Sequence, residues 1–168
     1  MPFTTRILVV ANRTVDAPSL LSVLDQRAAS GPLSVTLLVP ARRAEREQAQ
    51  ARADRAALCL HAGGIAAVTI LGPEDPVVAV EEIYENRRFD EIVVSTLEAG
   101  MSPWLAAGLP ERIRRQTDAI VQHVSVPRAE VEPPVAREQA TAQPRRALFE
   151  GVLGLLRVDT NRVGHPQG

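Results

Sequence analysis

The stretch DPVVAVEEIYENRRFDEIVVST (residues 75–96) predicts a helix followed directly by a buried strand. Asp75 suits an N-cap and Pro76 the first helical position, where a missing N–H costs nothing. Apolar side chains then recur at helical spacing on one face, at Val77, Val80, Ile83 and Tyr84. DEIVVST (90–96) is a nearly continuous apolar and β-branched run, typical of a strand covered on both faces.

The same alternation of strand and helix extends over most of the chain. Strands are predicted at residues 6–12, 33–40, 65–72, 90–96 and 118–126. Helices are predicted after an N-cap at Asp16 and at residues 41–64, 73–89 and 103–116. Alternating elements of this kind form a parallel sheet, and right-handed crossovers place helices on both of its faces. The predicted fold is therefore a three-layer α/β sandwich with five parallel strands.

The composition limits the class of protein. A chain of 168 residues suits one domain, and only 3% of the residues are aromatic, so the core must be aliphatic. The 19 basic residues, all arginine, are balanced by 20 acidic ones, which gives no general case for nucleic-acid binding. A single cysteine, Cys59, excludes an internal disulfide and a cysteine-rich zinc site.

The N-terminus and the C-terminal part add two expectations. There is no leader pattern, and no apolar run approaches the roughly 20 residues that span a bilayer, so a soluble, cytoplasmic protein is expected. After Val126 the segment 127–144 contains four prolines and predicts an extended or disordered linker. The predicted domains are 1–127 and 128–168, with a possible short helix at 145–158.

Ligands of open α/β sheets bind beyond the carboxyl ends of strands, where the strand order reverses. In a sheet of order 3-2-1-4-5, this point lies between the first and fourth strands. The candidate binding residues follow those strands or end the second one, and they are Ala11, Asn12, Arg13, Thr14, Val39, Ser95, Thr96, Leu97, Gly100, Ser102 and Gly108. Ser102 and Pro103 also predict an N-cap, and that helix would point its N-terminus into the cleft.

Segment 75–96 and the element order resemble the universal stress protein family over about residues 5–126. The resemblance implies a Rossmann-like fold with strand order 3-2-1-4-5. It also implies ATP or AMP binding, as in many members, and a role in the stress response. Many members also form dimers.

The nucleotide loop of that family reads Gly, two residues, Gly, nine residues, then Gly and a Ser or Thr. On this chain these positions fall on Ser95, Glu98, Gly108 and Leu109, so only the third glycine matches. ATP binders of the family tend to carry Asp where this chain has Asn12. Glycines let the backbone approach phosphates, Leu109 offers no hydroxyl, and Glu98 would place negative charge near a polyphosphate. These departures predict weak or lost ATP binding.

Several residues have both a structural and a functional interpretation. Trp104 could pack on the sheet or stack on a base. Asn12 could fix the turn after the first strand or bind a ligand. Cys59 is expected to be an inert packed thiol, and no histidine has metal-ligand spacing or a catalytic partner.

The first functional hypothesis is a non-enzymatic sensor or regulatory protein. It would form a homodimer through the exposed edge of the fifth strand, at Ile120, Val121, Val124 and Val126. The second is a functional adenine-nucleotide binder with a divergent loop, and the third is a nucleotide hydrolase or transferase of the same superfamily. No catalytic residue or metal site can be named for the third.

Overall fold

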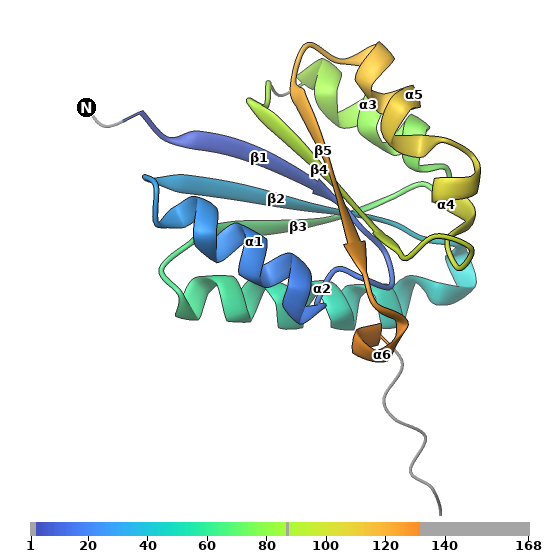
Figure 1. Cartoon of the computed structure of the whole chain (residues 1–168), viewed down its shortest axis with the longest axis horizontal. Helices are drawn as coiled ribbons and strands as arrows, with labels where there is room; N and C mark the ends of the chain where they lie inside the picture. The colour runs from blue at the N-terminus through green and yellow to red at the C-terminus, as the bar shows by residue number, and fades with distance from the viewer. Residues whose placement is uncertain (1–2, 87, 132–168) are drawn as a thin grey trace, which may run out of the picture. The chain divides into compact units, whose positions relative to one another are not determined.

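The computed structural model describes residues 3–86 and 88–131. Its contacts divide the chain into two units, Met1–Pro134 and Val135–Gly168, and the second unit lies outside the described residues. The helix predicted at 145–158 therefore lies outside them as well. In the first unit the predicted fold class is confirmed, because five parallel strands form one sheet of order β3-β2-β1-β4-β5 (Figure 1).

The strands and helices lie close to their predicted positions. The strands are β1 (Thr5–Val10), β2 (Leu33–Pro40), β3 (Ala66–Gly72), β4 (Glu91–Leu97) and β5 (Ile120–Val126). The helices are α1 (Pro18–Ala28), the 3-10 turn η1 (Arg43–Glu45), α2 (Arg46–Ala62), α3 (Pro76–Asn86), α4 (Pro103–Ala106), α5 (Leu109–Gln116) and α6 (Arg128–Val131). Asp75 caps α3 as predicted, since its Oδ1 accepts a hydrogen bond of 2.8 Å from the Val77 N–H.

Helices cover both faces of the sheet, α1 and α2 on one face and α3 and α5 on the other (Figure 1). Successive side chains of the central strands enter opposite cores, so that Val93 packs with the first pair of helices and Val94 with the second. All seven residues of β4 are buried, which explains its nearly continuous apolar sequence.

Small side chains bring the helices close to the sheet. The buried face of α2 consists almost entirely of alanine, namely Ala49, Ala53, Ala56 and Ala57, with Leu60. On the other face, a Cβ on Gly72 would lie 2.8 Å from the Cβ of Ala79, so only glycine lets α3 start this near to β3. Close packing thus replaces the aromatic volume that the composition lacks.

Four local predictions were wrong, the first of them at Cys59, which is exposed instead of packed. Asp16 does not cap α1, because it pairs with Arg55 at 2.8 Å and Ala17 occupies the N-cap. The helix predicted at 103–116 is divided into α4 and α5, because Gly108 adopts a left-handed conformation with φ of 65°. The start of the predicted linker forms α6 instead of extended chain.

The edge of β5 is less apolar than predicted. Val121 and Val126 are buried, at 8% and 0% exposure, because their side chains pack into the protein's own core. Val124 is partly buried against the core, and Ile120 is the one predicted edge residue with a largely exposed side chain, at 67%. Within the described residues, no helix is long and apolar enough to cross a membrane.

Candidate functional site

A cleft of about 290 Å³ opens where β1 and β4 end, at the predicted reversal of strand order, and we call it the switch-point cleft. Seven of the eleven predicted residues line it: Asn12, Arg13, Thr14, Ser95, Thr96, Leu97 and Ser102. The lining residues not included in the predicted site come from the end of β2, the loops after β2, β3 and β4, η1 and α4, and they are Pro40, Ala41, Arg42, Glu45, Glu74, Met101, Pro103 and Trp104. Its size is near the lower end for small-molecule sites.

Four predicted residues do not line the cleft. Ala11 and Val39 are completely buried in the core beneath it. Gly100 has φ of 83° and forms the turn in which the Met101 N–H bonds to the Glu98 carbonyl at 3.1 Å. Gly108 separates α4 from α5. Both glycines thus adopt the positive φ that their turns require, and neither of them lines the candidate site.

Asn12 is held between two elements, which fixes the orientation of its amide. Its Nδ2 donates to the Pro40 carbonyl at 2.9 Å, and its Oδ1 accepts from the Arg52 guanidinium at 2.9 Å. A carbonyl can only accept and a guanidinium can only donate, so the reversed amide would lose both bonds. The Asn12 side chain therefore joins the end of β2 to α2, and the residue also lines the cleft.

Arg52 supports this arrangement from α2. Burial lowers the pKa of its guanidinium, and the neighbouring Asp16 acts in the opposite direction. Its Nε is buried without a hydrogen-bond partner among the described residues. The Asn12 amide therefore accepts its hydrogen bond from the Arg52 guanidinium, whose Nε has no partner among the described residues.

Thr14 and Ser95 join the ends of β1 and β4 below the cleft. The Thr14 hydroxyl donates to the Ser95 carbonyl at 3.1 Å. The Ser95 hydroxyl is buried, with the residue 1% exposed, and it has no partner among the described residues. An unpaired buried hydroxyl costs about 1–3 kcal/mol, and Ser95 is also one of the residues that line the cleft.

The Thr96 hydroxyl, by contrast, is already engaged. It lies 2.8 Å from the Leu97 carbonyl and 2.8 Å from Nε2 of His123. The hydroxyl has one proton and can donate to only one of these two groups, so the tautomer of His123 decides which of them accepts it. Burial lowers the pKa of His123.

The charges that line the cleft are balanced, with Arg13 and Arg42 against Glu45 and Glu74. Arg42 and Glu74 form an ion pair of 2.6 Å between the loops after β2 and β3. The hydrogen bond from Arg42 to Glu74 raises the pKa of Arg42, so this guanidinium stays charged. The cleft therefore has no excess positive charge for a polyanion.

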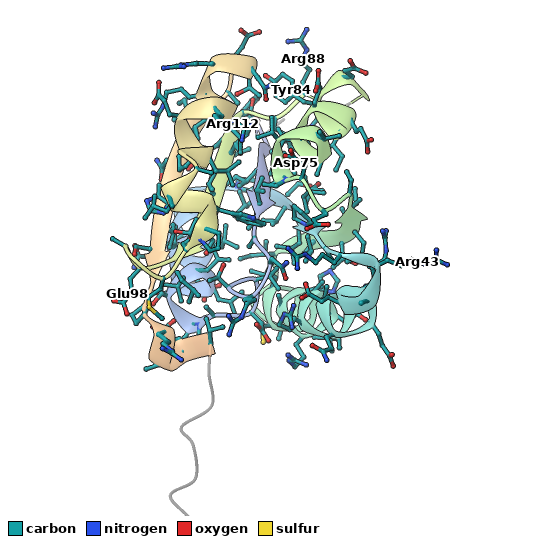
Figure 2. All side chains as sticks on the ribbon, turned by 90° about the vertical axis from the view of Figure 1, so that its right-hand side faces the viewer. Arg43, Asp75, Tyr84, Arg88, Glu98 and Arg112 are labelled. Carbon is teal, nitrogen blue, oxygen red and sulfur yellow. The ribbon has the colours of Figure 1, made fainter. Side chains whose placement is uncertain are left out.

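The loop after β4 differs from the predicted phosphate loop. Ser102 does cap α4, accepting from the Leu105 N–H at 3.2 Å, but α4 has only four residues and so a small dipole. Figure 2 faces the carboxyl ends of the strands and shows Glu98 on the outer side of this loop. Glu98 is exposed and is not among the residues that line the cleft. Glu45 and Glu74 supply the carboxylates there.

A second cleft, of about 380 Å³, lies beside the first, between the starts of α3 and α5. Trp104 and Glu74 line both clefts. The second cleft is lined by Asp75, just before α3, and from the facing side by Arg112 of α5 (Figure 2). Trp104 is partly buried against the core, as its packing interpretation predicts. Within residues 3–86 and 88–131, no group of three or more His, Cys, Asp or Glu side chains could hold a metal ion.

Comparison with known proteins places the fold. No protein-family model matches the chain, and no curated protein sequence is significantly similar to it. The structure of a universal stress protein from Archaeoglobus fulgidus is similar at a TM-score of 0.51 with 13% sequence identity, covering 71% of this chain and 92% of that one. The chain therefore has the fold of universal stress proteins, which confirms at the level of fold the resemblance in the sequence.

Two further structures align with lower TM-scores. One is a universal stress protein in complex with cAMP, with a TM-score of 0.49 and 18% identity over 72% of this chain and 96% of that one. The other is a protein of the universal stress protein family from Burkholderia pseudomallei, with a TM-score of 0.46 and 18% identity over 71% of this chain and 95% of that one.

Proposed function

We propose that this chain is a non-enzymatic sensor or regulatory protein. Its switch-point cleft would bind an uncharged small molecule of the nucleoside class, and its ATP binding would be weak or lost. The observation that carries the proposal is the Ser95 hydroxyl, buried without a described partner in a residue that lines the cleft. A ligand hydroxyl or ring nitrogen that reached it would remove the cost of leaving it unpaired.

The charges around the cleft favour a neutral ligand. Two carboxylates, Glu45 and Glu74, line the same space as two guanidinium groups. A polyphosphate would meet both carboxylates, while a sugar could donate its hydroxyl hydrogens to them. The apolar side chains Leu97, Met101 and Trp104 offer surface for a planar base.

The backbone argues against a phosphate cradle of the family type. Gly100 and Gly108 have structural functions outside the cleft, and Leu109 is 1% exposed in the core where the family motif has a hydroxyl. The backbone amides that glycines would bring close to phosphates thus have no counterpart in the matching positions.

Adenine-nucleotide binding is the second candidate. Arg13 and Arg42 line the cleft, and their charge could hold a single phosphate such as that of AMP. A hydrolase or transferase would additionally turn over ATP in a metal-dependent manner, which the first proposal does not allow.

We also propose a homodimer through β5. Its support is that β5 is an edge strand and that Ile120 is exposed. The Ile120 N–H and the Val126 carbonyl bond toward β4, so the backbone groups of the intervening odd-numbered residues face outward and could pair with a second copy.

A Ser95→Ala variant tests the binding site. Removing an unpaired buried hydroxyl should leave the melting temperature equal or higher. The affinity for adenosine should fall about 3- to 10-fold, because one neutral hydrogen bond contributes about 0.5–1.5 kcal/mol. Calorimetric titration and thermal melting of the full chain give both values. Ser125→Ala, on the exposed edge of β5, is the matched control and should bind normally. Unchanged adenosine affinity in Ser95→Ala would contradict the assignment.

A further inference from the structure

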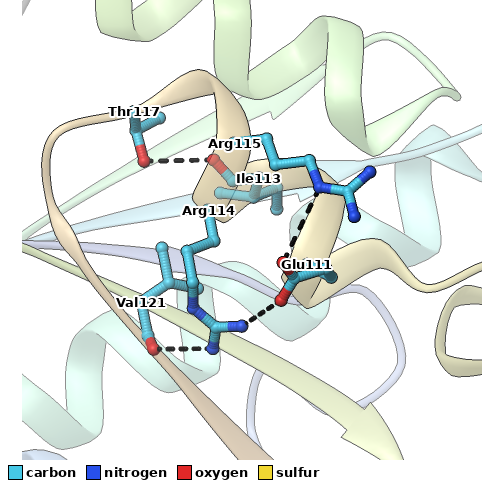
Figure 3. Close-up of polar contacts among 6 residues, drawn as sticks. All are labelled: Glu111, Ile113, Arg114, Arg115, Thr117 and Val121. Carbon is cyan, nitrogen blue, oxygen red and sulfur yellow. Dashed lines mark hydrogen bonds and ion pairs between the residues drawn. The ribbon is translucent and has the colours of Figure 1, made fainter.

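The outer edge of β5 already has a hydrogen-bond donor on it. Arg114, in α5, reaches over the edge and donates from Nη2 to the Val121 carbonyl at 3.4 Å (Figure 3). This carbonyl faces away from the sheet, because the flanking Ile120 N–H bonds inward to the Asp90 carbonyl. The first outward acceptor of the edge is therefore occupied within the same chain.

Glu111 holds the Arg114 side chain over the edge. The Glu111 carboxylate accepts from Nη1 of Arg114 and lies 3.7 Å from Nε of Arg115 (Figure 3). The helix that carries all three is anchored, since Ile113 is completely buried and its carbonyl accepts from the Thr117 hydroxyl at 3.1 Å. The Arg114 side chain therefore extends from a helix that is firmly packed against the core.

The geometry of strand pairing gives this contact a consequence. A two-fold antiparallel pair of β5 strands centred on His123 places Val121 opposite Ser125 of the second copy. The Val121 carbonyl would then have to accept from that Ser125 N–H on the same outward side that Arg114 already contacts, so the Arg114 side chain and the second copy compete for that position. Pairing would also bring the Arg114 charge of each copy to the β5–β5 contact, and charged side chains on an edge strand commonly protect it against strand addition.

The other edge of the sheet is covered in a similar way. Nε2 of His61, in the last turn of α2, lies 2.9 Å from the carbonyl of Ala67 on β3. Each edge strand is therefore contacted near its start by a basic side chain of the preceding helix.

We infer that Arg114 controls association through β5: it closes the edge in the monomer and must leave Val121 before a second copy can pair. This inference rests on the proposed dimer. Glu111 acts through Arg114, so loss of the carboxylate should weaken the closure, whereas Arg115 does not touch β5 in the described contacts and should not affect it.

The test compares the full chain with Arg114→Ala and with Arg115→Ala as matched control. Sedimentation equilibrium should show dimerisation about 10- to 100-fold tighter for Arg114→Ala, because pairing releases one such contact in each of the two copies and each is expected to contribute about 3- to 10-fold. Dimerisation should be unchanged for Arg115→Ala. Glu111→Gln should change the equilibrium in the same direction by less. If circular dichroism shows that Arg114→Ala does not fold, Glu111→Gln tests the inference in its place.

Cross-linking separates this inference from the dimer itself. In a Cys59→Ser background, His123→Cys places a thiol at the predicted two-fold centre. Cross-linking at position 123 that increases in Arg114→Ala supports the inference. If position 123 cross-links but Arg114→Ala and Glu111→Gln associate no more tightly than the wild type, the dimer exists and the inference that Arg114 regulates it is wrong. Absence of cross-linking in every variant overturns the dimer, and the inference with it.

Discussion

Asn12 combines a structural function with a place in the lining of the cleft. Its amide connects the end of β2 to α2 through Pro40 and Arg52, and it also lines the cleft. An aspartate, the residue found in ATP binders of the resembling family, could accept from Arg52 but could not donate to Pro40. The asparagine therefore follows from the local structure, and the sequence had left its function open between turn and ligand.

His123 gives a prediction for the dependence of stability on pH. Burial lowers its pKa in the folded state below the ordinary value of 6.5, so the unfolded chain binds the proton more readily. The stability conferred by neutral His123 is complete above pH 6.5 and falls as the pH decreases below it. The melting temperature of the wild type should therefore fall more between pH 7.5 and 5.5 than that of His123→Gln. Parallel melting curves of the two proteins would contradict this explanation.

The site residues could be predicted from the sequence only where strand order alone determines them. Asn12, Thr14 and Ser95 follow or end the two strands that flank the reversal, and the structure brings them to one cleft. Glu45 comes from η1 and Glu74 from the loop after β3. The signal that could have found them is their position just after the second and third strands, whose ends meet at the same edge. The burial of the Ser95 hydroxyl depends on three-dimensional packing, which no local pattern encodes.

At the scale of elements, α1 depends on a residue far away in the sequence. Its N-cap, Ala17, has no side chain to bond the first amides. Glu130 of α6 supplies the missing acceptor, bonding to the Ser19 N–H at 2.9 Å and to the Ser19 hydroxyl at 2.5 Å. Pattern analysis selected Asp16 because it considered only the neighbouring chain, and it assigned α6 to a linker because of the surrounding prolines.

This contact makes a prediction about stability. Glu130→Gln removes the negative charge at the N-terminus of α1 and weakens two hydrogen bonds, so the free energy of unfolding should fall by about 0.5–1.5 kcal/mol. Urea denaturation measures the change. Glu81→Gln, on the exposed surface of α3, is the control and should change stability by less than about 0.5 kcal/mol. Equal stability of the two variants would mean that Glu130 does not act as a cap.

At the scale of the whole unit, the fold was predictable because several independent signals agree. The strands alternate with helices, the strands are rich in β-branched residues, and helix ends carry recognisable caps or glycines. The split between α4 and α5 was harder to predict, because the apolar pattern continues across Gly108. The exposure of β5 was also misjudged, since the pattern cannot show which edge residues turn back into the core.

The central claim is that a fold shared with universal stress proteins here serves a neutral ligand and not ATP. The measurement that tests it most directly is calorimetric titration of the nucleotide-stripped full chain with adenosine, AMP and ATP, with and without magnesium. We predict that adenosine binds at least about tenfold more tightly than ATP, a difference of about 1.4 kcal/mol, and that magnesium does not change this order. Tighter binding of ATP, or its turnover in the presence of magnesium, would contradict the account.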